Sequence, residues 1–152
     1  MTQALIVYAS LTGNTRAGAE IVEDTFEEMN VNVDVLESYD ADPFDFEDYD
    51  ICVVGTYTYG IHGELPDEIV DFYEELEDVE LTEKLYGVFG SGDVFYGDKY
   101  CKSVDDFVEQ FEKTGALQGS EVVKYNLDPD EEATQALKEF AKELVAKHEQ
   151  MN

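Results

Sequence analysis

One short segment of the chain has residue types suited to binding an anion: Ser10-Leu11-Thr12-Gly13-Asn14-Thr15. It follows an apolar run from Ala4 to Tyr8 and opens an amphipathic segment, which predicts a turn between a strand and a helix. Backbone N–H groups and neutral hydroxyls in such a turn can surround a phosphate, and the helix dipole favours the anion. The lysine of a triphosphate-binding loop and the G-x-G-x-x-G spacing are both absent. The turn therefore suits a single phosphate monoester.

Two later segments combine glycine with tyrosine, and each follows an apolar run. They are Thr56-Tyr57-Thr58-Tyr59-Gly60-Ile61-His62-Gly63 and Ser91-Gly92-Asp93-Val94-Phe95-Tyr96. Open parallel sheets bind ligands beyond the carboxyl ends of their strands, where the strand order reverses. A planar aromatic ligand with one phosphate would fit there, with a tyrosine face available on either side.

The elements that must position these segments alternate along the chain. Continuous apolar runs predict strands over residues 5–8, 31–36, 51–55, 85–90 and 122–127, with four helices between and after them. This alternation predicts an α/β fold with a doubly wound, five-stranded parallel sheet. The second and fifth strands carry charged residues and are expected at the edges. The acidic connection from Asp40 to Asp50 is expected to be pinned by Phe44 and Phe46.

Capping residues predict the helix ends. Asn30 is suited to ending the first helix, and Pro66 is expected as the first residue of the second. Ser103 is expected to cap the third helix, with Gly115 just beyond its end. The fourth is expected to start at Asp128-Pro129, with Glu131 completing a capping box.

Charge excludes two classes of partner. The 152 residues include 37 acidic and nine basic side chains, for a net charge of −28. Nucleic acid and anionic membranes need clustered Lys and Arg, so neither is an expected partner. The acidity indicates either partners with basic patches or adaptation to a salty cytoplasm.

Cysteine use and hydropathy indicate a cytoplasmic protein. Cys52 and Cys101 are too few and too far apart for a disulfide framework, a zinc site or a C-x-x-C motif, and no metal site is expected. No apolar stretch approaches the ~18 residues of a membrane span, and no basic leader precedes the first apolar run. Cys52 is expected in the core.

The residues at particular positions exclude one class of signalling domain and one class of enzyme. A phosphoacceptor receiver domain needs acids after the first and third strands, where this chain has Ala9-Ser10 and Gly55-Thr56. A serine hydrolase needs G-x-S-x-G, but Phe89 and Asp93 flank Ser91 at the glycine positions.

Three motifs, in order along the chain, are similar to those of one family. Ser10 to Thr15 resembles the loop that holds the phosphate of FMN in short-chain flavodoxins. Thr58-Tyr59-Gly60 resembles the loop that packs an aromatic residue on the inner flavin face, with Tyr59 where many members have Trp. The segment from Gly92 to Tyr96 resembles the loop whose tyrosine stacks on the outer face. The resemblance covers essentially the whole chain.

The resemblance implies a flavodoxin-like fold with strand order 2-1-3-4-5, in a single domain over residues 1–152. Flavodoxins are a standard case of ligand binding at the strand-order switch point. It further implies a low-potential one-electron carrier, not an enzyme, with non-covalently bound FMN. The implied partners are a flavodoxin reductase and electron acceptors with basic docking patches, and the implied state is a monomer. The implied FMN contacts are Ser10, Leu11, Thr12, Gly13, Asn14, Thr15, Thr56, Tyr57, Thr58, Tyr59, Gly60, Ser91, Gly92, Asp93, Tyr96 and Cys101.

Two roles and two departures follow from the same resemblance. Gly60 would stabilise the one-electron-reduced flavin by a peptide flip, which glycine makes easy, and Asp93 would bind N3 of the ring. Ile61 stands where relatives often have an acid, and one extra residue lies before Cys101. An FMN-dependent reductase that takes hydride from NAD(P)H for quinones, and a non-redox binding module, remain open alternatives.

Overall fold

The computed structural model describes residues 2–10, 13–58, 65–92 and 101–151. Within them the strands are β1 (Gln3–Tyr8), β2 (Asn32–Glu37), β3 (Ile51–Tyr57), β4 (Leu85–Gly92), β5 (Leu117–Gln118) and β6 (Val123–Asn126). The α-helices are α1 (Asn14–Glu28), α2 (Asp67–Leu76), α3 (Lys102–Lys113) and α4 (Glu131–Met151). Two 3-10 helices, η1 (Ser38–Asp40) and η2 (Pro43–Asp48), connect β2 to β3.

All strand pairs in the described sheet are parallel, and their order confirms the predicted 2-1-3-4-5. β1 pairs with β2 and β3, and β3 pairs with β4. The strand predicted over residues 122–127 is present as β6 (Val123–Asn126), and the sheet has one strand more than predicted, because the two-residue β5 also pairs with β4. β5 was not predicted because its two residues are both exposed and form no apolar run.

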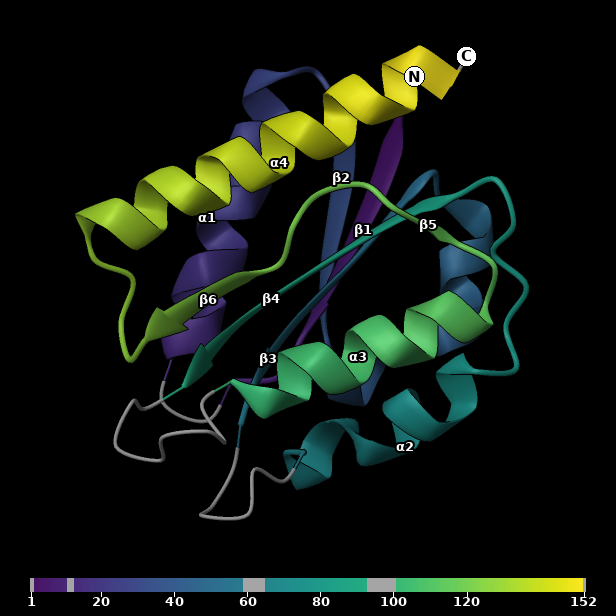
Figure 1. Cartoon of the computed structure of the whole chain (residues 1–152), viewed down its shortest axis with the longest axis horizontal. Helices are drawn as coiled ribbons and strands as arrows, with labels where there is room; N and C mark the ends of the chain where they lie inside the picture. The colour runs from purple at the N-terminus through teal and green to yellow at the C-terminus, as the bar shows by residue number, and fades with distance from the viewer. Residues whose placement is uncertain (1, 11–12, 59–64, 93–100, 152) are drawn as a thin grey trace.

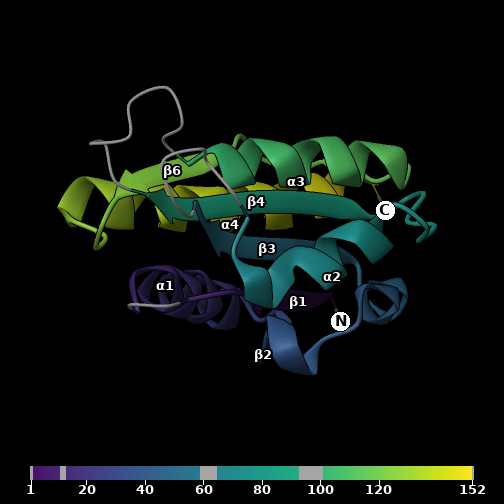
Figure 2. The ribbon, with the colours of Figure 1, turned by 90° about the horizontal axis from the view of Figure 1, so that it is seen from below.

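Two pairs of helices cover the two faces of the sheet. In Figure 1, α1 and α4 lie on one side of the strands and α2 and α3 on the other. Figure 2, seen from the side of α2 and α3, shows α4 behind the strands. One buried cluster joins Ile6 and Phe89 to Phe140, and the other joins Val54 and Val88 to Phe107. Burial of each such aliphatic or aromatic side chain contributes about 1.5–3 kcal/mol, so the central strands are stabilised from both faces.

Edge and centre strands differ in burial as predicted. Every residue of β1 from Ala4 onward is buried, and β3 and β4 are buried except at their last residues. β2 has only exposed and partly buried residues, and in β6 two exposed residues accompany the partly buried Val123 and the buried Tyr125, so both strands are less buried than the central ones, as expected at the edges.

Three predicted helix starts need correction. Pro66 is the residue before α2, because its ψ of 138° is extended. Ser103 is the second residue of α3, and the preceding Cys101 occupies the cap position. The α4 helix starts at Glu131, and Asp130 is the residue whose side chain accepts from Ala133 N at 2.8 Å.

Two helix ends are confirmed. Asn30, with φ +62°, follows the end of α1, and Gly115, with φ +84°, follows the end of α3. Of the two aromatic residues expected to pin the acidic connection, Phe46 is fully buried and Phe44 is 46% exposed, so only Phe46 does so. Among the described helices, none has the length and apolar character needed to cross a membrane.

Candidate functional site

The carboxyl ends of β1, β3 and β4 are joined to one another by hydrogen bonds. Ala9 N donates to the Gly55 carbonyl at 3.0 Å, which continues the pairing of β1 and β3 by one residue. The hydroxyls of Thr15 and Ser91 are 2.9 Å apart, and the Thr15 hydroxyl lies 3.4 Å from the Thr56 carbonyl. These contacts hold the start of α1 against the ends of β3 and β4.

Ser10 folds the turn between β1 and α1. Its Oγ accepts hydrogen bonds from Gly13 N at 3.1 Å and from Arg16 N at 3.3 Å. Gly13 has φ +90°, a left-handed conformation that glycine adopts without a Cβ penalty. Because Ser10 Oγ acts as an acceptor in both bonds, its hydroxyl hydrogen remains available for a ligand.

The first turn of α1 has the character of an anion site. None of the described residues accepts a hydrogen bond from the backbone N–H groups of Asn14 and Thr15. The first turns of the other three described α-helices carry acids, such as Asp67 in α2 and Glu131 in α4. The first turn of α1 has none, although the chain has 37 acidic residues. Open N–H donors at the positive end of a helix favour an anion there.

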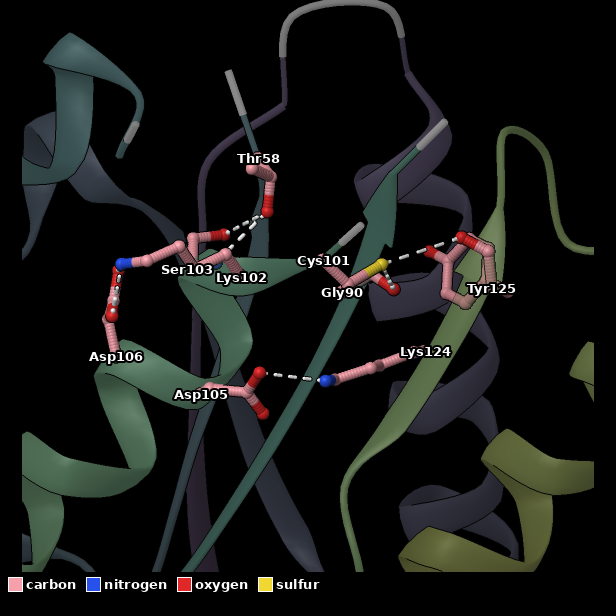
Figure 3. A network of polar contacts seen from close by, with 9 residues as sticks. All are labelled: Thr58, Gly90, Cys101, Lys102, Ser103, Asp105, Asp106, Lys124 and Tyr125. Atoms are coloured by element: carbon pink, nitrogen blue, oxygen red, sulfur yellow. Dashed lines mark hydrogen bonds and ion pairs between the residues drawn. The ribbon is translucent and has the colours of Figure 1, made fainter. Parts of the chain in front are cut away.

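The end of β3 and the start of α3 share a second cluster of hydroxyls, which Figure 3 shows from close by. Ser103 N donates to Thr58 Oγ1 at 3.0 Å, and the Ser103 hydroxyl donates to the Tyr57 carbonyl at 2.8 Å. Ser103 is missing from the predicted site. In the sequence, a serine near the start of a helix indicates only a cap for that helix, so nothing linked Ser103 to the site.

Two predicted contact residues have environments that limit what their side chains can do. Burial, and then the nearby Glu68 carboxylate, raises the pKa of Tyr57, so its phenol stays protonated at neutral pH. Cys101 is fully buried, and its Sγ lies 3.7 Å from the Gly90 carbonyl and 3.9 Å from that of Tyr125. The Cys101 thiol therefore faces the protein interior.

The structure brings together ten of the predicted contact residues at or next to these strand ends. They are Ser10, Gly13, Asn14, Thr15, Thr56, Tyr57, Thr58, Ser91, Gly92 and Cys101. Six others lie outside the described residues: Leu11, Thr12, Tyr59, Gly60, Asp93 and Tyr96. Ile61, where relatives often have an acid, also lies outside them.

These residues fit a ligand with one phosphate. The groups at the start of α1 are amide donors and neutral hydroxyls, which bind a phosphate without a metal ion. Among the described residues, the one group of three potential metal ligands is Glu23, Asp24 and Glu27, partly or fully exposed carboxylates farther along α1.

A doubly wound sheet whose switch between β1 and β3 carries helix N–H donors without an acceptor among the described residues is typical of α/β proteins that bind a phosphate-bearing ligand. Comparison with known proteins is more specific. The family model for flavodoxin matches residues 6–140. The chain is 37% identical to probable flavodoxin 1 of Bacillus subtilis, over 100% of this chain and 96% of the relative.

Solved structures agree with that match. A flavodoxin of Streptococcus pneumoniae TIGR4 is 53% identical with a TM-score of 0.93, over 96% of this chain and 99% of that one. A short-chain flavodoxin associated with a non-canonical PDU bacterial microcompartment is 44% identical with a TM-score of 0.95, over 97% and 99%. The chain belongs to the flavodoxin family.

Family membership confirms the predicted class of function. Flavodoxins are FMN-binding electron-transfer proteins and not enzymes, so this chain is an FMN-binding electron carrier that works with redox partners.

Proposed function

We propose that this protein is a low-potential one-electron carrier between a flavodoxin reductase and acceptor redox proteins. In this proposal residues 1–152 form a single flavodoxin-like domain that holds FMN at the carboxyl ends of β1, β3 and β4. The observation that carries it is the first turn of α1, where two N–H donors lack an acceptor among the described residues and no acid is present.

The residues of the β1–α1 turn would hold the phosphate. The N–H groups of Asn14 and Thr15 donate to it, the Ser10 hydroxyl hydrogen adds a third donor, and the dipole of α1 stabilises its charge. Thr15 has a different role, because its hydroxyl is already bonded to Ser91 and Thr56. The Thr15 hydroxyl holds the start of α1 in place, and the Thr15 backbone N–H would bind the phosphate.

The ring of FMN would lie beside the segments that follow β3 and β4, in contact with Tyr59, Gly60, Asp93 and Tyr96. FMN, when bound, supplies a ring that accepts and releases electrons. Tyr57, Thr58, Ser91 and Gly92 stand at the ends of these strands and set where the two segments leave the sheet.

A low potential follows from negative charge near the ring. Burial is the largest cause that raises the pKa of Tyr57, and the Glu68 carboxylate raises it further, so a negative charge lies near this strand end. Charge repulsion from this carboxylate would disfavour a reduced flavin anion. Remote acids contribute less, because screening at physiological salt has a length of about 8 Å.

The proposed partners carry basic docking patches, since 37 acids oppose nine basic residues. Four of those basic residues, Arg16, Lys102, Lys113 and Lys124, are in ion pairs with carboxylates. Binding of nucleic acid or anionic membranes is not part of the proposal. A reducing cytoplasm fits the two buried cysteine thiols, and a monomer is also part of the proposal.

The test compares FMN with riboflavin, which has the same ring without the phosphate. We expect the apoprotein to bind FMN at least tenfold more tightly than riboflavin, because good charge-assisted hydrogen bonds contribute about 1.5–3 kcal/mol each. Stepwise anaerobic reduction of the complex, followed by absorption, should then show two separate one-electron steps. Failure to bind FMN would contradict the proposal, and rapid NADPH oxidation without a separate reductase would favour the FMN reductase.

A further inference from the structure

The α3 helix begins without a side-chain cap of its own. Its cap residue, Cys101, has the left-handed φ of +54° and makes no side-chain hydrogen bond to the first turn. The first N–H groups of a helix have no intrahelical acceptors and need partners from elsewhere. At α3 such a partner comes from a different element.

Thr58 supplies that partner from the end of β3. Its Oγ1 lies 3.0 Å from Ser103 N and 3.1 Å from Ser103 Oγ, while Ser103 Oγ lies 2.8 Å from the Tyr57 carbonyl. One arrangement of protons satisfies all three contacts. Ser103 donates its amide hydrogen to Thr58 and its hydroxyl hydrogen to the Tyr57 carbonyl, and the Thr58 hydroxyl donates to Ser103 Oγ. Figure 3 shows the two side chains pointing toward one another.

The surroundings leave this network little freedom. Ser103 is fully buried, as is the neighbouring Cys101, whose Sγ lies against the Gly90 carbonyl. A Cβ on Gly90 would overlap the Val104 side chain and the Thr56 carbonyl, so α3 packs directly on the ends of β3 and β4. A buried, fully satisfied polar network defines one arrangement, because an unpaired partner would be costly.

We propose that Thr58 and Ser103 form a positioning pair that fixes the two ring-binding segments of the FMN site relative to one another. Thr58 immediately precedes Tyr59 in the sequence, and Ser103 follows Cys101 and Lys102 at the far end of the segment after β4. The pair therefore joins the chain entering one segment to the chain leaving the other. It acts on the ring end of the site and not on the phosphate end. This inference rests on the proposed function.

The test uses Thr58→Val and Ser103→Ala, each of which removes one hydroxyl without changing charge. Loss of a hydrogen bond of about 0.5–1.5 kcal/mol corresponds to about 2- to 13-fold in affinity. We expect each variant to weaken riboflavin and FMN by the same factor within that range. Both variants should also shift the one-electron midpoint potentials in the same direction, whereas Thr58→Ser, which keeps the hydroxyl, should restore wild-type values.

A matched control lies at the other end of the same helix. Thr114 is also buried, and its Oγ1 accepts from Ala116 N at 3.2 Å. Thr114→Val removes a buried threonine hydroxyl at the C-cap of α3, at the opposite end of the helix from Ser103, so it should lower the free energy of unfolding but leave riboflavin affinity and potentials unchanged. In the apoprotein, Thr58→Val but not Thr114→Val should speed hydrogen exchange at the Ser103 amide.

The variant that carries both changes tests whether Thr58 and Ser103 act as a pair or independently. Both single changes remove the contact between the two hydroxyls, while Thr58→Val keeps the bond from Ser103 Oγ to the Tyr57 carbonyl and Ser103→Ala keeps the backbone bond to Thr58 Oγ1. Because that hydroxyl contact can be lost only once, Thr58→Val/Ser103→Ala should weaken riboflavin by less than the two single losses combined. Additive losses, or single variants with wild-type riboflavin affinity and potentials, would overturn the pair and leave the proposed function standing. A wild-type protein that binds neither flavin would overturn both.

Discussion

Tyr125 on β6 donates a hydrogen bond from its hydroxyl to the carbonyl of Asn14, at 2.8 Å across 111 positions of the sequence. The bond ties the first residue of α1 to the strand at the opposite edge of the sheet from β2. It is possible only because residue 18, one turn along α1, has no side chain: a Cβ on Gly18 would overlap Tyr125 Oη.

The space at Gly18 gives the first prediction. Gly18→Ala should lower the free energy of unfolding by about 1–3 kcal/mol, the usual cost of overpacking, in spite of the better helix propensity of alanine. Urea unfolding of the apoprotein measures this. Gly18→Ala/Tyr125→Phe removes the overlapping oxygen and should recover part of the loss; a double variant less stable than Gly18→Ala alone would contradict the explanation.

Ser10 gives a prediction for the phosphate end of the site. Ser10→Ala removes the acceptor for Gly13 N and Arg16 N together with the proposed donor to the phosphate. FMN affinity should fall about tenfold, which corresponds to the ~1.4 kcal/mol expected for a cap or a charge-assisted bond. Riboflavin affinity should change little, and calorimetric titration with both ligands checks this. Equal losses for the two ligands would place Ser10 away from the phosphate.

Charge in the first turn of α1 gives a prediction that depends on salt. The ion pair of Arg16 with Glu20 is largely exposed and contributes little to stability. Arg16→Glu would place an acid where the other helices have one, and should weaken FMN by about 2- to 5-fold more than Arg16→Gln does. The difference between the two variants should shrink between about 0.01 M and 0.3 M NaCl. A difference that does not depend on salt would exclude an electrostatic cause.

Cys52 gives a prediction for pH. Burial raises the pKa of its thiol in the folded protein, whereas the unfolded chain has the ordinary value of about 8.5. The contribution of this neutral thiol is therefore fully present below about pH 8.5 and is lost as the pH rises, at about 1.4 kcal/mol per pH unit. Cys52→Ala should be less stable at pH 7 because of the cavity, yet lose less stability between about pH 8 and pH 10. Parallel pH profiles for the two proteins would contradict this.

The sequence predicted those parts of the fold that depend on burial. Runs such as Ile51 to Gly55 and Leu85 to Gly90 are buried on both faces, so their apolar character identified them as central strands. β5 and the start of α3 depend instead on contacts made by residues distant in sequence. Leu117 is half exposed and pairs with Leu85, and nothing local distinguishes it from a loop residue.

The site divides in the same way. Ser10 and Gly13 bond within their own turn, so a local motif was enough to find them. Ser103 and Tyr125 act on elements 45 and 111 positions away, through Thr58 and Asn14, and no spacing rule links such pairs. Local sequence thus identifies the groups proposed to bind the ligand, whereas the residues that support them become visible only in the folded chain.

The division of the edge strand into β5 and β6 also affects whether two copies of the molecule can pair through their sheet edges. Residues 119–122 interrupt the ladder between them, and each piece offers only a few backbone groups along that rim. An incoming extended peptide would find no long, uninterrupted row to pair with, which works against fibril-like stacking in a densely populated cell.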